Sequence, residues 1–258
     1  MTDQDTYMVY IPASGHGSRI RELAGNKPKT LLQVGEQTIL ARLLFAASAL
    51  PNTQVVISVR PEDMFIERYL QSHDFSCAIE IKKMAPGGYL ADLVRVGKET
   101  GYNEFTVLNS DLVAPLPDLL RFLGGVRRWV QEVPLVIGVT EPTPDQYNAE
   151  DIWLTPQSDV SFTVNPPGMQ GDLMIANAHH WRPSGLQEAE YLLSQRPTRF
   201  HDYIARLAQQ NRLVGGIPLS QAYNVNTADL LARAQAEVIA WQRSGNDTPV
   251  LSQQPDIE

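Results

Sequence analysis

A small-residue loop close to the N-terminus carries the strongest chemical signal in this sequence. It follows an apolar run at residues 8–11, which predicts a buried first strand. Glycine permits positive φ and a close approach of ligand to the main chain. Successive backbone N–H groups in such a loop form a concave site for phosphate oxygens. We therefore expect phosphate binding by the loop residues Ala13, Ser14, Gly15, His16, Gly17 and Ser18.

Two cations accompany the loop. Arg19 offers a planar fork of donors to phosphate, and Lys29, within Pro28-Lys29-Thr30-Leu31, adds a compact mobile charge. Neither common phosphate-binding template fits, because Ile20 stands where the dinucleotide fingerprint has its third glycine and no Gly-Lys-Ser/Thr follows. The alternative is an ordinary strand-to-helix turn with both cations solvated. That alternative gives no reason for the Pro-Lys-x-Leu continuation.

Asp111 is the candidate metal ligand. It comes shortly after the apolar run Phe105–Leu108, which predicts a buried strand, so its carboxylate is expected where that strand ends. A hard oxygen at this place suits Mg²⁺ bridging nucleotide phosphates. The alternative is an aspartate that caps a helix or closes a turn.

The chain resembles the nucleoside-diphosphate-sugar pyrophosphorylases and related sugar-phosphate nucleotidyltransferases. Their usual opening is Ala-Gly-x-Gly-Ser/Thr-Arg, then Pro-Lys-x-Leu and a later glycine. Here residues 14–19, Pro28–Leu31 and Gly35 occupy those places, with Ser14 where alanine or glycine is more usual. The resemblance implies transfer of a nucleotide from an NTP to a phosphorylated acceptor, with release of pyrophosphate. It also implies a metal-holding aspartate at the position of Asp111.

Two further matches follow from the same resemblance. The segment Tyr223–Leu230 resembles the family's Asp-x-Gly/Asn-Thr-Pro-x-Asp-Leu, and its Asn-Val-Asn-Thr form is similar to molybdopterin-nucleotide transferases. Asn224 or Asn226 is then a second, neutral ligand to Mg²⁺; the alternative is an Asx-turn before the last helix. Gly88 matches the place where the family's backbone approaches the nucleotide base, although Tyr89 and Leu90 depart from its Gly-Thr-Ala.

One family feature is missing. Many members carry Glu-Lys-Pro in the second half, where the lysine contacts the acceptor phosphate, whereas here the place reads Val164-Asn165-Pro166 and no lysine follows Lys98. Arg182, or His179 or His180, is the expected replacement. Each histidine could equally be a core residue. The departure leaves the identity of the acceptor open.

The elements that must position these residues alternate between strand and helix, which predicts an α/β fold. We expect a doubly wound, mostly parallel but mixed, Rossmann-like sheet flanked by helices, with ligands beyond the carboxyl ends of its strands. Beyond about residue 140 we expect antiparallel strands appended to this sheet. Strands are predicted at 8–11, 55–59, 78–81, 105–108, 135–139, 160–164 and 173–175, and helices at 38–50, from 61, at 90–96, from 117, at 186–194, 200–210 and 228–241.

The boundaries expected are one domain over 1–243 and a disordered polar tail over 244–258. Within the domain, residues 1–140 would bind nucleotide and residues 141–243 the acceptor. The 258 residues include 43% hydrophobic and 19% charged residues, which is typical of a globular protein. The net charge of −8 argues against nucleic-acid or anionic-membrane partners, and the single cysteine, Cys77, fits a reducing cytoplasm.

The function expected is NMP transfer from an NTP to a phosphorylated small molecule, with Mg²⁺ as cofactor and a sugar 1-phosphate as the favoured acceptor. Arg19 and Lys29 would be the catalytic residues. The alternatives are a cytidylyltransferase for an alcohol or amino-alcohol phosphate, a molybdopterin-type guanylyltransferase, and a non-catalytic domain that binds nucleotide as a regulatory signal. The nucleotide base and the oligomeric state are not fixed by the sequence.

Overall fold

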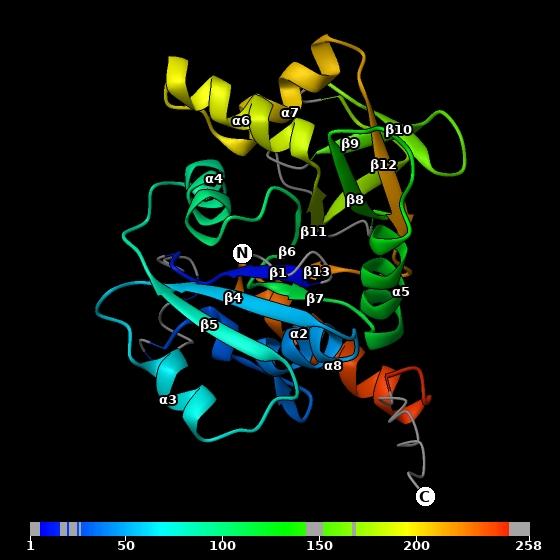
Figure 1. Cartoon of the computed structure of the whole chain (residues 1–258). Coiled ribbons are helices and arrows are strands. Elements are labelled where there is room, and N and C mark those ends of the chain that lie inside the picture. The colour runs from blue at the N-terminus through cyan, green and yellow to red at the C-terminus, as the bar shows by residue number, and fades with distance from the viewer. Residues whose placement is uncertain are drawn as a thin grey trace, which may run out of the picture.

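The fold is built on a nine-stranded mixed sheet (Figure 1). The computed structural model describes residues 6–15, 20, 25, 27–142, 152–166 and 169–247. Four neighbouring strands of the first half run parallel in the order β5-β4-β1-β6. Their bounds are Tyr7–Pro12 for β1, Thr53–Val59 for β4, Ala78–Lys83 for β5 and Phe105–Leu108 for β6. These apolar runs have the composition of strands covered on both faces, as the sequence predicts.

The second half of the chain enters the middle of the sheet. Strand β11 lies between β6 and β8 and is antiparallel to both. Beyond β8 come β12, which is parallel to it, then β10 and β9, and β9 also pairs with β11. The expectation of antiparallel strands merely appended to a parallel sheet is therefore corrected. The bounds are Leu135–Thr140 for β8, Trp153–Pro156 for β9, Ser161–Val164 for β10, Leu173–Trp181 for β11 and Leu213–Pro218 for β12.

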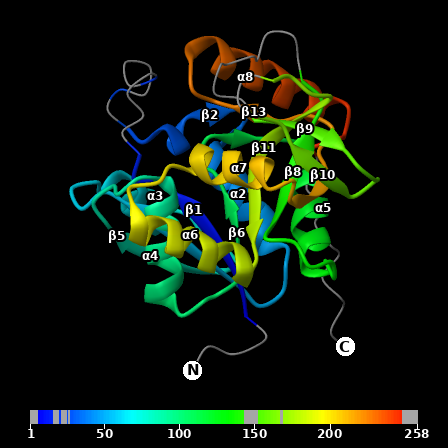
Figure 2. The same ribbon diagram turned by 90° about the horizontal axis from the view of Figure 1, so that it is seen from above.

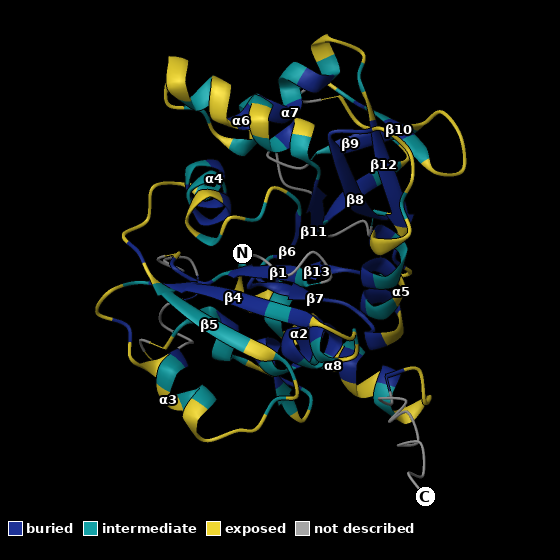
Figure 3. Cartoon of the chain, viewed as in Figure 1, coloured by how far each residue is buried: buried dark blue, intermediate teal, exposed yellow. Residues whose placement is uncertain are grey.

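Helices cover both faces of the sheet, and the sheet separates two apolar clusters (Figures 1 and 3). Helices α2, α3, α5 and α8 pack on one face, and their buried side chains belong to one apolar cluster. Helices α4, α6 and α7 cover the other face and line a second cluster; Figure 2 shows these three from above. The bounds are Ile39–Ser48 for α2, Phe65–Gln71 for α3, Tyr89–Thr100 for α4, Leu116–Arg127 for α5, Pro183–Gln195 for α6, Phe200–Gln209 for α7 and Ala228–Arg243 for α8. The described helices include none long and apolar enough to cross a membrane.

Most predicted elements are present, but the start of one helix differs and several strands were not predicted. Helix α3 begins at Phe65 and not at Pro61, because the Asp63 carboxylate accepts the Phe65 N–H at 2.9 Å just before the first turn. Strands β9 and β12 were not predicted. Strand β12 has two glycines, Gly215 and Gly216, whose lack of side chains leaves room for Trp129 and Phe162, and glycine weakens any strand pattern in a sequence.

Three short pieces of structure position the candidate site. A 3₁₀ turn, η2, covers Lys29–Leu31 and leads into the hairpin of β2 (Gln33–Val34) and β3 (Gln37–Thr38). Gly35 closes the hairpin at φ +63°, and a Cβ there would lie 2.7 Å from Val238 on α8. A separate two-stranded sheet pairs β7 (Leu112–Val113) with β13 (Tyr223–Asn224).

Residues 244–247 are packed, in contrast to the expectation of a disordered tail from 244. Asp247 is buried and makes two hydrogen bonds to the guanidinium of Arg42 on α2, at 2.6 and 2.8 Å. It also accepts the Leu116 N–H at 3.0 Å, at the start of α5. The ordered chain therefore extends to this ion pair. Residues 248–258 lie outside the described residues.

Candidate functional site

The parallel strands of the first half end at a common edge of the sheet. Strand β1 is the parallel neighbour of β6, so Ala13, Ser14 and Gly15 leave the sheet at the same edge as Asp111. Ala13 donates to the Ser58 carbonyl at 2.9 Å, which holds the start of the loop against β4. Gly88 precedes α4 in the connection after β5, at φ +92°. The edge thus gathers the described part of the predicted phosphate loop, although His16, Gly17, Ser18 and Arg19 lie outside the described residues.

Lys29 projects from η2, whose turn is closed by hydrogen bonds from the Leu31 and Leu32 N–H groups to the carbonyls of Pro28 and Lys29. The neighbouring Thr30 is buried, which anchors the turn. The hairpin that follows packs on α8, where Gln235 donates to the Gln33 carbonyl at 2.9 Å. The base of the lysine is therefore fixed while its flexible stem can reach outward.

The ammonium of Lys29 donates hydrogen bonds to Asp111 and Asn226. Its Nζ lies 2.5 Å from Asp111 Oδ2 and 3.3 Å from Asn226 Oδ1. Asp111 is buried and Lys29 is mostly buried, so this ion pair is shielded from water. Three segments that lie far apart in the sequence, around residues 29, 111 and 226, therefore converge on one point.

The β7–β13 pair brings the asparagine segment to Asp111. Asn224 pairs with Leu112, and the Val225 N–H donates to the Asp111 carbonyl at 2.9 Å. Thr227 then caps α8 by accepting the Leu230 N–H at 3.3 Å, as predicted. The backbone thus holds residues 224–226 alongside residues 111–112, whichever ligand the site takes.

Two oxygens at this point have no hydrogen-bond partner among the residues that the structure describes. They are Asp111 Oδ1 and Asn224 Oδ1, and both are buried. An orphaned buried oxygen is costly, so such atoms indicate an unassigned partner. Hard carboxylate and amide oxygens are ligands that suit Mg²⁺. Within the described residues no three His, Cys, Asp or Glu side chains form a metal-binding group, so a Mg²⁺ ion here would need ligands from bound phosphates or water.

A pocket of about 870 Å³ opens beside these residues, and we call it the α4–α7 pocket. It lies between the start of α4, the end of β6, the bulge of β11 and the start of α7. Asn109, two residues before Asp111, is part of its wall and connects it to the Lys29–Asp111 point. Its lining includes Gly88, Tyr89, Asn109, Asn177, His179, Thr198, Arg199, Phe200 and Asp202.

Of the three candidates for binding the acceptor phosphate, His179, His180 and Arg182, only His179 lines this pocket. It is buried, and its Nδ1 forms a 2.8 Å hydrogen bond with the Tyr89 hydroxyl. Arg182 lies at the opposite edge of the sheet, because β11 runs antiparallel to β6, and its guanidinium binds Glu104 at 3.0 Å. His180 faces the same carboxylate, with Nε2 at 2.9 Å. The structure thus does not bring Arg182 or His180 to the site.

The pocket contains asparagines that the sequence did not single out. Asn177 sits at the bulge in β11, at φ +32°, and its carbonyl accepts the Asn109 N–H at 3.1 Å. Asn109 belongs to the same Asn-Ser-Asp segment as Asp111. Its position at the end of a predicted strand could therefore have marked it as a candidate site residue. No sequence pattern predicted the bulge that exposes Asn177.

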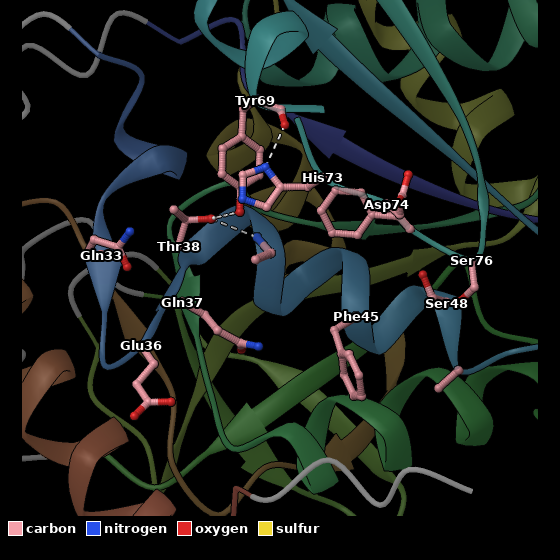
Figure 4. Close-up of a pocket in the computed structure, with 13 residues that line it drawn as sticks. Gln33, Glu36, Gln37, Thr38, Phe45, Ser48, Tyr69, His73, Asp74 and Ser76 are labelled. Atoms are coloured by element: carbon pink, nitrogen blue, oxygen red, sulfur yellow. Dashed lines mark hydrogen bonds between the residues drawn. The ribbon is translucent and has the colours of Figure 1, made fainter. Parts of the chain in front are cut away.

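A second hollow, of about 820 Å³, lies apart from the predicted site residues (Figure 4). Its walls come from α2, the β2–β3 hairpin and the segment after α3. Tyr69 and His73 stack there with ring centroids 4.1 Å apart, and the Thr38 and Tyr69 hydroxyls lie 3.0 Å apart. None of the described residues that were predicted to bind nucleotide, metal or acceptor lines it.

Burial of His179 makes the stability of the fold depend on pH. Burial lowers the pKa of His179 to about 3, against about 6.5 for the unfolded chain. Below pH 6.5 the unfolded chain therefore binds a proton that the folded chain does not. The free energy of unfolding should fall as the pH drops toward 3, by up to about 1.4 kcal/mol per pH unit for this residue.

Urea unfolding of the wild type and of His179→Asn between pH 7 and pH 4.5 measures this contribution. We expect a shallower loss of stability in the variant, with the exposed His73→Asn as control. Burial also lowers the pKa of His180, which adds a slope of the same sign in both proteins and cancels in the comparison. Equal slopes for wild type and His179→Asn would contradict the prediction.

The sequence resembles two known enzymes over part of its length, although no family model matches the chain. Over 97 residues it is 31% identical to 2-C-methyl-D-erythritol 4-phosphate cytidylyltransferase of Shewanella frigidimarina (strain NCIMB 400), covering 37% of this chain and 39% of that protein. Over 123 residues it is 28% identical to the mannose-1-phosphate guanylyltransferase catalytic subunit beta of Dictyostelium discoideum, covering 43% of this chain and 33% of that protein.

The solved structure of UDP-glucose pyrophosphorylase from Acinetobacter baumannii superposes with a TM-score of 0.73 at 15% identity, covering 94% of this chain and 96% of that one. The chain is thus similar, over part of its length, to two nucleotidyltransferases that act on phosphorylated acceptors. Its α/β fold is the one found in the solved NDP-sugar pyrophosphorylase structure, as the sequence predicted. The chain spans well under half the length of the two sequence relatives that it matches.

Proposed function

We propose that this protein is an enzyme that transfers NMP from an NTP to a phosphorylated small-molecule acceptor and releases pyrophosphate. The observation that supports this most directly is the convergence of Lys29, Asp111 and Asn226 at the carboxyl edge of the sheet. The sequence relatives named above are themselves a cytidylyltransferase and a guanylyltransferase. A sugar 1-phosphate is the favoured acceptor.

The reaction requires positioning and charge neutralisation more than proton transfer. A phosphate oxygen of the acceptor attacks the α-phosphorus of the NTP, a new P–O bond forms, and the bond to the β-phosphate oxygen breaks. An acceptor phosphate is already ionised at neutral pH, so no general base is required. Catalysis then depends on holding the two phosphates in line and neutralising their combined charge.

Different residues of the chain bind and neutralise the different phosphates. Backbone N–H groups of the loop from Ala13 to Ser18 hold the phosphates that leave as pyrophosphate, and Arg19 neutralises them. Lys29 stabilises the charge that builds on the α-phosphate. Its ammonium is already held beside a buried carboxylate, so little reorganisation is needed for it to reach a phosphate at the same point.

Mg²⁺ fits the oxygens present at this point. Asp111, with Asn224 or Asn226, would hold it, and Asp111 and Asn224 each have a buried oxygen that has no partner among the described residues. Bound there, Mg²⁺ would supply positive charge that offsets the charge of the nucleotide phosphates. Because this set has one carboxylate and neutral amides, the phosphates would supply much of the binding.

Two alternative functions keep the same nucleotide site. A cytidylyltransferase for an alcohol or amino-alcohol phosphate, or a molybdopterin-type guanylyltransferase, differs only in base and acceptor. A regulatory domain would bind nucleotide without turnover. The presence of Arg19, Lys29 and Asp111 together argues for catalysis, since a domain that only binds nucleotide has no chemical need of all three.

Pyrophosphate release tests the proposal. Each of ATP, GTP, CTP, UTP and dTTP is combined with Mg²⁺ and with sugar 1-phosphates, alcohol phosphates and amino-alcohol phosphates in turn. We expect acceptor-dependent release with one base, abolished by EDTA and restored by Mg²⁺. NTP binding by calorimetry without release for any acceptor would instead favour the regulatory alternative.

A further inference from the structure

The second hollow, between α2, the β2–β3 hairpin and the segment after α3, has the size of a ligand site (Figure 4). We call it the α2–hairpin pocket. Its volume of about 820 Å³ lies within the usual range of small-molecule pockets. None of the described residues to which we assign a role in NMP transfer lines it. A molecule bound here would therefore be a third ligand, in addition to the two substrates.

A cluster of aromatic rings forms one wall of this pocket. The rings of Tyr69 and His73 stack with centroids 4.1 Å apart and planes inclined by 24°. Phe75 extends the cluster, with its ring centroid 6.5 Å from that of Tyr69 and 6.4 Å from that of His73. The outer member, His73, is exposed to solvent. Such a stack offers ring faces and edges to a further flat group.

Hydrogen bonds hold the two stacked rings in place (Figure 4). Thr38 accepts the Ala41 N–H at 3.1 Å and donates to the Tyr69 hydroxyl at 3.0 Å. The Nδ1 of His73 lies 2.8 Å from the Tyr69 carbonyl oxygen, to which it can only donate. In the neutral ring Nε2 is then left as an acceptor. The wall is thus already ordered, which lowers the entropic cost of binding a ligand.

The acids that line the pocket make it electronegative. Glu36 on the hairpin and Asp74 after α3 are both lining residues, and no lysine or arginine is among the described residues of the lining. Both acids are exposed, so a ligand can reach their carboxylates. Figure 4 shows the two side chains on opposite sides of the hollow. The pocket therefore favours a cation and repels a phosphate.

Uncharged polar groups add hydrogen-bond acceptors to the same lining. Gln33 and Gln37 contribute side-chain amides from the hairpin, and Ser48 and Ser76 contribute hydroxyls. Ser48 Oγ is buried and has no hydrogen-bond partner among the described residues, and such an atom indicates an unassigned partner. Together with the carboxylates, the amide oxygens can accept N–H groups. A matching ligand carries such donors as well as positive charge.

We propose that the α2–hairpin pocket binds a small, flat organic cation with N–H donors, of the aromatic amidine or guanidine type. Its ring lies against the stack of Tyr69 and His73, and its charged group is directed to a carboxylate of the lining. A cation gains both from an aromatic face and from a carboxylate that accepts its N–H groups. The site is separate from the Lys29–Asp111 point and does not depend on the transfer reaction.

Three flat probes of nearly equal size test the proposal: benzamidine, benzamide and benzoate, which are cationic, neutral and anionic. Each is titrated into the full chain at pH 8, where ordinary histidines are neutral, and followed by the backbone amide NMR signals. We expect shifts centred on residues 36–38 and 73–76. The Kd of benzamidine should be roughly fivefold below that of benzamide, since an exposed carboxylate and a ring face each contribute modestly. Benzoate should bind most weakly.

Equal affinities for benzamidine and benzamide would overturn the proposal, as would shifts confined to other parts of the chain. No NTP is present in these titrations. Their outcome is therefore distinct from that of the pyrophosphate assay, and a protein without transferase activity could still bind benzamidine in this pocket.

Variants identify the groups responsible. Glu36→Gln/Asp74→Asn removes both carboxylates at nearly constant shape, and should bring the benzamidine and benzamide affinities close together. Glu132→Gln/Asp172→Asn makes the same charge change at exposed positions outside the lining, and should preserve the difference. His73→Ala removes one ring of the stack and should weaken both probes by roughly threefold or more. An undiminished preference for benzamidine in the first variant would contradict the role of the carboxylates.

Discussion

Lys29→Ala should lower kcat by roughly 10²- to 10³-fold or more, in keeping with the loss of one preorganised group that stabilises transition-state charge. The lysine is the described cation that lies within hydrogen-bond distance of both Asp111 and Asn226. Its loss removes positive charge from the place where charge builds on the α-phosphate. Steady-state pyrophosphate release, with NTP and acceptor saturating, measures the effect.

Lys27→Ala is the matched control, because this exposed lysine lies two residues away and carries the same charge. It should change kcat less than about twofold, since an isolated surface charge contributes little. The fold of Lys29→Ala should survive, which circular dichroism and thermal unfolding can verify. Near-normal turnover in a folded Lys29→Ala protein would refute the role of Lys29.

Asp247→Ala should destabilise the protein by about 3–5 kcal/mol, because it leaves the buried guanidinium of Arg42 without its carboxylate partner. That side chain is 1% exposed, and Asp247 is its one carboxylate partner in the described structure. The change also removes the acceptor of the Leu116 N–H. In a chain of this size the melting temperature should fall by about 10 °C.

The exposed Asp74→Ala is the control for this experiment, and its melting temperature should move by a degree or two at most. The double variant Arg42→Leu/Asp247→Leu distinguishes an unpaired charge from lost packing. We expect it to recover much of the stability, because replacing both members of a buried pair is often close to neutral. A melting temperature for Asp247→Ala within 2 °C of the wild type would contradict the importance of this ion pair.

The positions of the proposed metal ligands could be predicted because local sequence determines where they lie. Asp111 comes three residues after the largely apolar strand Phe105–Leu108, and such a strand delivers the residues that follow it to the carboxyl edge of the sheet. Thr227 likewise indicated the start of α8, and with it the position of Asn224 and Asn226. For these residues, the strand-and-helix pattern was sufficient to place them at one site.

The residues that escaped prediction depend on contacts between distant parts of the chain. Asp247 lies in a polar stretch that reads as a tail, and its partner Arg42 precedes it by 205 residues. Arg182 was expected at the site because no local pattern shows that β11 runs backward between β6 and β8. The place of Asn177 depends on the bulge in that same strand. The bulge arises from the way β11 pairs with its neighbours, which the composition of the strand does not reveal.

The place of β11 also determines when this protein can fold. During synthesis, β6 is complete at Leu108, but its second neighbour, β11, is not complete until residue 181 has been made. Likewise β8 cannot pair with β12 until residue 218 has been made. Until then an apolar strand edge stays unpaired, which invites association with other chains. The two halves of the chain are therefore interleaved, and a fragment that ends near residue 140 should aggregate rather than form a working nucleotide-binding unit.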